Sequence, residues 1–133
     1  MLVSPKQISP SQNFLKEKTV RFIFDYLRDG NSGVLPPTPL VRKDEEGNLV
    51  AIDGHNLIAA RLFREEDVEV IVAESVTDGL SPTTEANITR NKELAAKFDS
   101  VLEERRKVAA EGVITFADLI ARYQPLFDEL SAS

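Results

Sequence analysis

The stretch LVRKDEEGNLVAIDGHNLIAARLFREEDVEVIVA, residues 40–73, carries the strongest structural pattern in the chain. Two short runs rich in β-forming residues flank the acidic, glycine-containing turn Asp44–Asn48, which is typical of a β-hairpin. From Gly54 the β pattern stops, and the apolar residues of 57–62 indicate one short helix, followed by a strand over 68–73. A strand, a helix and a strand within about twenty-five residues predict a small crossover unit packed on a sheet.

The residues that precede this stretch predict one more strand and one more helix. Short apolar residues mixed with prolines and serines over 2–8 indicate a short strand followed by a turn. We expect Thr19 to cap a helix that runs to about Asp29 and ends at the glycines and asparagine of 29–33. Its buried face is predicted to consist of Val20, Ile23, Phe24 and Leu27.

The residues that follow it predict mainly helices. Residues 75–87 form a composition break and are expected to be a linker or irregular arm. The next segment, which Gly112 ends, predicts an amphipathic helix of about twenty residues. Thr115 and Asp118 form a capping box that begins a further short helix, and Pro125 begins a last apolar turn. The apolar stripe of the long helix is predicted to consist of Ile88, Ala95, Phe98, Val101, Leu102, Val108 and Ala109.

Together these elements predict an α+β fold, in which a small mixed sheet with short packed helices is followed by C-terminal helices. We expect residues 1–80 to form one domain. Residues 81–133 are expected to be a helical extension that packs on that domain or serves self-association. The 133 residues are enough to bury roughly two-thirds of the surface of the unfolded chain.

Composition and charge narrow the classes of function. The chain has no cysteine, which excludes disulfides, thiolate metal sites and cysteine-based catalysis. No apolar run is long enough to cross a bilayer and no leader is recognisable, so we expect a cytoplasmic protein without a membrane partner. The net charge of −6 is uneven: residues 1–43 are basic and residues 44–85 strongly acidic. This balance argues against strong autonomous DNA binding, although a basic face from the N-terminal third stays an alternative.

The order of motifs resembles the ParB/sulfiredoxin-like domain family. In that family a proline-bounded strand, here PLVR at 39–42, precedes a glycine-containing hairpin. The next strand ends in a motif of the form Asp-Gly-His-x-Arg-x-Ala-Ala, and a strand such as VEVIV at 68–72 follows. The N-terminal segment VSPKQISPSQNF is similar to the first apolar box of the family. The resemblance covers residues 3–73 and implies that the predicted domain of residues 1–80 has this fold.

The resemblance implies a ligand site where the hairpin strand meets the short helix. Glycine lets the backbone approach a ligand closely, and the N–H groups at a helix start favour phosphate. In the family this corner contacts nucleotide phosphates, which implies a nucleotide with Mg²⁺ as the ligand. The phosphate- or nucleotide-binding residues are then Asp53, Gly54, His55, Asn56 and Arg61. We expect no catalytic residue and no dedicated metal site among them.

The chain departs from the family motif at Leu57, where an arginine is expected. Arg61, the next basic residue, lies about one helical turn farther along. Sulfiredoxins have a cysteine at the position of His55, so sulfinic-acid reduction is excluded. We therefore expect a phosphate corner that is weakened or repurposed.

Several alternatives stay open for single residues. His55 is either a phosphate donor or acid/base group or a turn histidine that bonds to the backbone. Asp53 either holds a metal ion or a substrate amine or caps the following helix, and Asn56 either donates to a phosphate or is exposed. The acidic turn at 44–46 lacks the spacing of a calcium loop and favours a solvated hairpin.

Three functions compete on these grounds. The first is a ParB-like binding module that recognises a nucleotide or a protein partner in a DNA partition or regulatory context and self-associates through its C-terminal helices. The second is a small-molecule phosphotransferase that uses Asp53 and His55. The third is a nucleic-acid-associated regulator that uses the basic N-terminal third.

Overall fold

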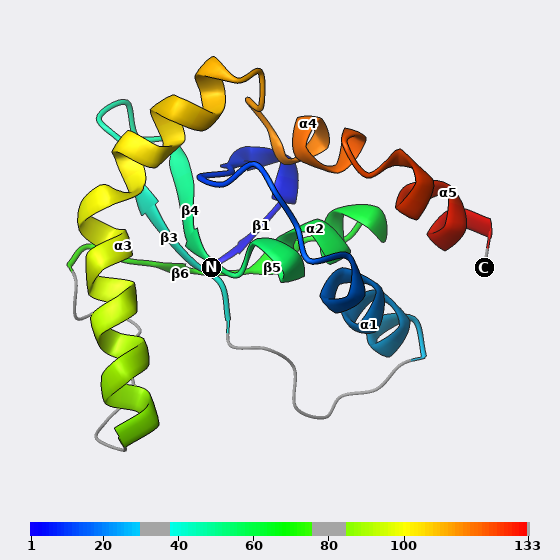
Figure 1. Cartoon of the computed structure of the whole chain (residues 1–133), viewed down its shortest axis with the longest axis horizontal. Coiled ribbons are helices and arrows are strands. Elements are labelled where there is room, and N and C mark those ends of the chain that lie inside the picture. Colours follow the sequence, from blue (N-terminus) through cyan, green and yellow to red (C-terminus); the bar gives the residue numbers. More distant parts are fainter. Residues whose placement is uncertain (30–37, 76–84, 133) are drawn as a thin grey trace.

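The computed structural model describes residues 1–29, 38–75 and 85–132. It confirms the α+β class: two small sheets and five α-helices form the fold (Figure 1). The strands are β1 (Leu2–Val3), β2 (Ile8–Ser9), β3 (Leu40–Lys43), β4 (Leu49–Asp53), β5 (Val68–Glu69) and β6 (Ile71–Val72). The helices are the 3-10 turn η1 (Pro5–Gln7), α1 (Glu17–Arg28), α2 (His55–Phe63), α3 (Glu85–Ala110), α4 (Phe116–Ala121) and α5 (Gln124–Ala132).

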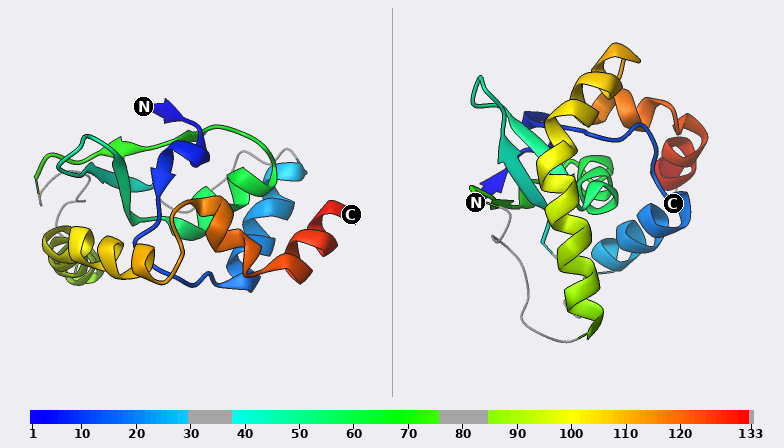
Figure 2. Two further views of the ribbon diagram at one scale, coloured as in Figure 1. Left: turned by 90° about the horizontal axis from the view of Figure 1, so that it is seen from above. Right: turned by 60° about the vertical axis from the view of Figure 1, so that its left-hand side comes forward.

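The main sheet has the strand order β2-β4-β3-β6 and lies between two layers of helices (Figure 2). Alternate residues of β4 face opposite layers, as the period of a strand requires. Ala51 belongs to the core shared with α1, α2 and α4, whereas Val50 and Ile52 pack with Val101 of α3. Because both of its faces are covered, β4 is an almost unbroken apolar run.

The predicted hairpin is confirmed, and its turn is held by Asp44. The Oδ1 atom of Asp44 accepts hydrogen bonds of 2.9 Å from the backbone N–H groups of Glu46 and Asn48. Gly47 in the same turn has a φ of 85°, a conformation that favours glycine. These contacts agree with a solvated hairpin turn at 44–46. Within residues 1–29, 38–75 and 85–132 no group of three acidic or histidine side chains is placed to hold a metal ion.

The crossover unit is only partly as predicted. The run 68–73 forms two strands, of which β5 pairs antiparallel with β1 and β6 pairs parallel with β3. Since β3 is antiparallel to β4, β6 runs opposite to β4, so α2 does not connect parallel neighbours. The strand β1, which is far away in the sequence, pairs with β5, so the first half of residues 68–73 belongs to a second sheet.

The start of α1 differs from the prediction. The helix begins at Glu17, two residues before the expected cap Thr19, and Lys16 occupies the capping position without a side-chain bond. The backbone N–H of Lys16 instead donates to Oδ1 of Asn56 in α2 at 3.0 Å. A tertiary contact therefore fixes the start of the helix. The predicted face is buried at Val20, Ile23 and Phe24, and Leu27 packs against the same core (half-buried).

The helix α3 is longer than predicted, with 26 residues, and its N-terminal half projects beyond the sheet (Figures 1 and 2). Consequently Ile88, expected in the stripe, is 46% exposed. Over residues 88–110 of the helix, the buried positions are Leu94, Val101 and Val108, spaced seven apart. Part of the predicted linker, residues 76–84, lies outside the described residues. The predicted break at 30–33 also lies outside them.

The capping box after α3 is confirmed. Oγ1 of Thr115 accepts from the N–H of Asp118 at 3.1 Å, and Oδ2 of Asp118 accepts from the N–H of Thr115 at 2.9 Å. The backbone hydrogen bonds from Thr115 and Ile114 lower the pKa of Asp118. The helix α4 stops at Ala121, and α5 starts one residue before the predicted Pro125. None of the helices in the described part of the chain is long and apolar enough to span a membrane.

Candidate functional site

The corner between β4 and α2 depends on Gly54. Its φ of 88° lies in the left-handed region, and it is the residue that precedes the first turn of α2. A Cβ atom at this position would lie 2.7 Å from the Cβ of Pro39, too close for any side chain. Since glycine offers no capping group, no side-chain hydrogen bond closes the start of the helix. The corner thus presents backbone N–H groups of the first turn of α2.

This corner forms one wall of a pocket of about 370 Å³. Among the described residues, three cationic side chains border it, Lys16 from the segment before α1 and Arg90 and Lys97 from α3, with Asp53 as the single carboxylate. The aromatic ring of Phe14, whose residue is 51% exposed, lies at the same pocket. The described residues that line it are Gln12, Phe14, Lys16, Thr19, Ile23, Asp53, Gly54, His55, Asn56, Leu57, Arg90 and Lys97.

Asp53 pairs with two cations and does not cap α2. Nη2 of Arg90 lies 3.2 Å from its Oδ2 and Nζ of Lys97 lies 3.6 Å from its Oδ1. The two cations are seven residues apart on α3, which places them two turns apart on one side of the helix. Asp53 therefore links the corner to α3.

His55 is a buried, neutral turn histidine. The residue is 4% exposed, its Nε2 accepts from the N–H of Ser11 at 3.0 Å, and its ring lies 5.6 Å from that of Phe116. The pKa of His55 is lowered to about 3, mainly by burial; Asp53 opposes this change, and Lys97 adds to it. With Nε2 as acceptor, the ring proton is on Nδ1. This arrangement favours the backbone-bonding alternative over an acid/base group, which must exchange a proton near neutral pH.

Asn56 and Leu57 have structural tasks at the corner. Asn56 is half-buried rather than fully exposed, and its Oδ1 accepts the N–H of Lys16, which positions that lysine at the pocket. Leu57, at the position where the family motif has arginine, is 6% exposed and belongs to the main core. The side chain of Leu57 thus packs in the core and offers no charge to a ligand.

Arg61 does not line the pocket, contrary to our prediction. It lies seven residues after Gly54, about 10 Å along the helix. There its Nη1 pairs with Oε2 of Glu66 at 2.7 Å, and Arg64 pairs with the other oxygen of the same carboxylate at 2.7 Å. Arg61 therefore fixes the end of α2 and takes no part in the corner.

The cations that do reach the corner were not predicted from the sequence. Lys16, Arg90 and Lys97 come from segments that precede or follow the motif by dozens of residues. The i, i+7 spacing of Arg90 and Lys97 was visible, but a charged helix face is ordinarily a solvated one. Only the packing of α3 on β4 brings Arg90 and Lys97 to the pocket.

A scan against models of protein families finds none that matches the chain, and no curated protein matches it. The resemblance to the ParB/sulfiredoxin-like family therefore stays a prediction based on the motif.

Proposed function

We propose that the chain is a binding module of the ParB/sulfiredoxin-like type that takes a phosphate-bearing ligand, in the simplest case a nucleotide, at the corner between β4 and α2. One observation carries the proposal: the uncapped start of α2 and three cationic side chains border the same pocket. Helix N-termini and cations are the two groups that most favour phosphate in proteins.

The charge of the pocket supports this function. Among the described residues of the lining, Lys16, Arg90 and Lys97 against Asp53 leave an excess of positive charge, although the whole chain carries −6. A locally positive potential on a protein of negative net charge is expected at a site that attracts an anion. In this proposal the two cations on α3 provide the positive charge that the family motif places at position 57, where this chain has leucine. The phosphate site would then be built from other residues instead of being weakened.

The remaining lining fits the other parts of a nucleotide. Phe14 offers an exposed ring on which a base can stack, and Gln12 offers amide groups that can donate and accept. If Mg²⁺ accompanies the phosphates, Asp53 is the carboxylate of the pocket that can contact it, while phosphate oxygens and water supply the other ligands.

The phosphotransferase alternative is less well supported. His55 is buried and neutral and its Nε2 is occupied by Ser11, so it offers no proton transfer to a ligand. The carboxylate of Asp53 is already paired with two cations of α3.

The nucleic-acid alternative relied on the basic N-terminal third, in which two of the cations have partners within the chain. Arg21 pairs with Glu129 of α5 at 2.6 Å. Arg42 on β3 lies over the ring of Phe98, with 4.2 Å from its Cζ to the ring centre, and donates to the carbonyl of that residue. These two contacts give no indication of a shared phosphate track.

Calorimetry with CTP, ATP and inorganic triphosphate, each with and without Mg²⁺, tests the proposal. We expect saturable binding that weakens with salt. Arg90→Gln should weaken it by about tenfold or more, as expected for the loss of a charge-assisted contact. Arg106→Gln is the matched control, because Arg106 lies on the same helix but pairs with Glu45 at the hairpin. Absence of binding of all three compounds at millimolar concentration, or equal effects of the two variants, would overturn the proposal.

A further inference from the structure

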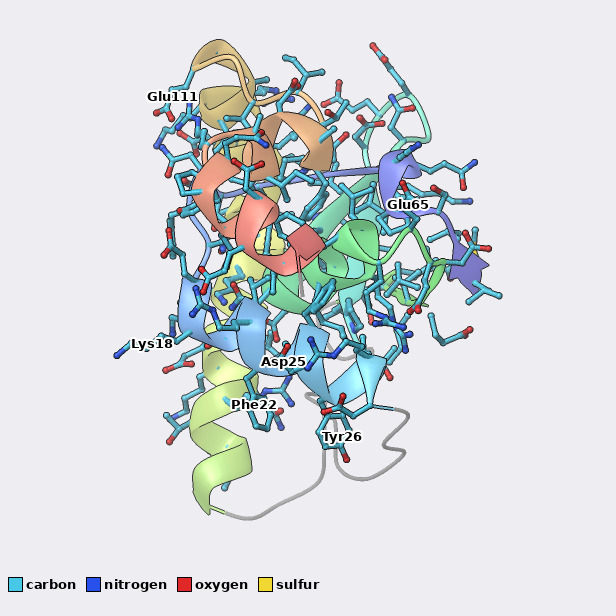
Figure 3. The ribbon with its side chains drawn as sticks, turned by 90° about the vertical axis from the view of Figure 1, so that its right-hand side faces the viewer. Lys18, Phe22, Asp25, Tyr26, Glu65 and Glu111 are labelled. Atoms are coloured by element: carbon cyan, nitrogen blue, oxygen red, sulfur yellow. The ribbon has the colours of Figure 1, made fainter. Side chains whose placement is uncertain are left out.

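The outer side of α1 carries an aromatic stripe that the proposed function does not use. Phe22 is 64% exposed and its ring lies 6.0 Å from that of Tyr26. Lys18 precedes Phe22 by one helical turn, and Asp25 follows it by nearly one turn. Figure 3 shows these four side chains along the outer side of α1, away from the buried face that packs on α2. We call Lys18, Phe22, Asp25 and Tyr26 the α1 stripe.

A hollow accompanies the stripe. It has a volume of about 370 Å³ and is lined by Glu17, Lys18, Arg21, Phe22 and Asp25. Four of these residues, at positions i, i+3, i+4 and i+7 from Lys18, form the diamond that receives a side chain of a facing helix. The surface of α1 thus offers both an aromatic knob, Phe22, and a hole beside it.

The charges of the α1 stripe on one copy are complementary to those on a second copy. In an antiparallel pair of α1 helices with the two-fold axis at Phe22, a residue that precedes Phe22 meets the residue equally far beyond it in the second copy. Lys18 lies four positions before the axis and Asp25 three positions after it, so they would be offset by about 1.5 Å along the axis. Lys18 would also face the ring of Tyr26. The same contacts occur twice, as a two-fold interface requires.

We propose that the α1 stripe is a self-association surface on which a second copy of this chain docks through an antiparallel α1–α1 contact. The knob of each Phe22 enters the hollow of the other copy, and each Lys18 pairs with Asp25 of the other copy. This surface replaces the C-terminal helices as the place of self-association and does not depend on the ligand corner.

Neighbouring charges permit this pairing. Within the chain Asp25 lies 3.4 Å from Nη2 of Arg28, and Arg21 pairs with Glu129, in exposed contacts that contribute little and rearrange easily. The helix has 12 residues and is about 18 Å long, so the contact is small. We therefore expect a weak dimer that forms with rising protein concentration.

Charge reversal provides a sharp test. Sedimentation velocity of the full chain should show a monomer–dimer equilibrium between about 10 µM and 1 mM, a range in which weak contacts are populated. Lys18→Asp places two acidic positions opposite each other, and Asp25→Lys places two basic positions opposite each other, so each variant alone should weaken dimerisation by about tenfold or more. An equimolar mixture of the two variants should restore it, because both contacts then join opposite charges.

Matched controls separate the stripe from general charge effects. Lys92→Asp and Glu93→Lys make the same changes of charge at exposed positions of α3 and should leave dimerisation unchanged. Circular dichroism checks that every variant is folded, and Phe22→Gln should abolish the dimer in a folded chain. A wild-type chain that stays monomeric at 1 mM would overturn the proposal. So would a mixture that fails to restore the dimer, or a dimer that survives all three stripe variants.

Discussion

The backbone N–H of Ser11 donates to Nε2 of His55 across 3.0 Å. The hydroxyl of Ser11 meanwhile donates to the carbonyl of Ala51 in β4 at 2.5 Å. The single histidine of the chain thus ties the segment after β2 to the corner at the start of α2. Protonation of Nε2 would require that this bond be broken, in addition to the transfer of charge into the core.

We predict that His55 stays neutral in the folded chain well below pH 6. Because His55 is the only histidine, its ring protons give one set of histidine signals in the ¹H NMR spectrum. These signals should not titrate between pH 7.5 and pH 4.5, since burial holds the pKa of the ring at about 3. A midpoint near 6.5 would show that the histidine is accessible and would reopen an acid/base role.

The same pKa predicts how stability depends on pH. In the unfolded chain the histidine binds a proton below its ordinary pKa of 6.5, whereas in the folded chain it does not. The unfolded state binds more protons, so the free energy of unfolding falls as pH falls, by about 1.4 kcal/mol per pH unit for this group. Denaturant titrations of the wild type and of His55→Gln between pH 7.5 and pH 4.5 should differ by that slope below about pH 6. Equal slopes would contradict the prediction.

Gly54→Ala should destabilise the fold more than the same change at two other glycines. Gly47, Gly54 and Gly112 all have positive φ, so each substitution incurs about 1 kcal/mol of backbone strain. At Gly47 and Gly112 a new Cβ meets no atom within 4 Å, whereas at Gly54 it collides with Pro39. Chemical denaturation should therefore show an additional loss of about 1–3 kcal/mol for Gly54→Ala, the usual cost of overpacking. Three similar values would mean that Pro39 moves away freely.

Glu65→Gly should stabilise the protein. Glu65 is the one non-glycine residue with positive φ, 57°, among the residues that the structure describes. It follows the end of α2, where its N–H donates to the carbonyl of Leu62 and the N–H of Glu66 donates to that of Arg61. This is the Schellman arrangement, which favours glycine at the left-handed position. We expect a gain of about 0.5–1 kcal/mol in thermal or denaturant unfolding, the difference between the left-handed strain and the entropy of glycine. Asp67→Gly, at a position without positive φ, should lower stability instead.

Asp53→Asn should strengthen the binding of inorganic triphosphate in the absence of Mg²⁺. The carboxylate of Asp53 competes with an anion for Arg90 and Lys97. Removal of a unit charge about 4 Å away changes the interaction by about 1 kcal/mol in water, which corresponds to about fivefold in affinity. The gain should shrink at high salt and should be absent in Arg90→Gln. Weaker binding of the metal-free anion to Asp53→Asn would show that Asp53 orders the cations instead of competing for them.

The elements that the sequence predicted correctly are those that local patterns specify. The turn at Asp44–Asn48 and the box of Thr115 and Asp118 satisfy their hydrogen bonds within a few residues, so their residue types suffice. The buried face of α1 follows from helical periodicity alone. At the corner, the change from strand to helix at Gly54 was likewise visible in the sequence.

The parts that the sequence did not predict depend on distant contacts. The start of α1 is set by Asn56, and the split of residues 68–73 is set by β1 on one side and β3 on the other. Arg61 is the first basic residue after Leu57, where the family motif has arginine, yet the rise of the helix carries it away from the corner and it pairs with Glu66.

The sequence by itself determined the hairpin, the glycine corner and the α+β class, because hydrogen bonds between near neighbours and the periodicity of apolar residues encode them. Only the tertiary structure decided what surrounds the corner. The packing of α3 on β4 brings Arg90 and Lys97 to Asp53, and the burial of His55 removes its charge. Both effects depend on distance and desolvation in three dimensions, which the order of residues along the chain does not state.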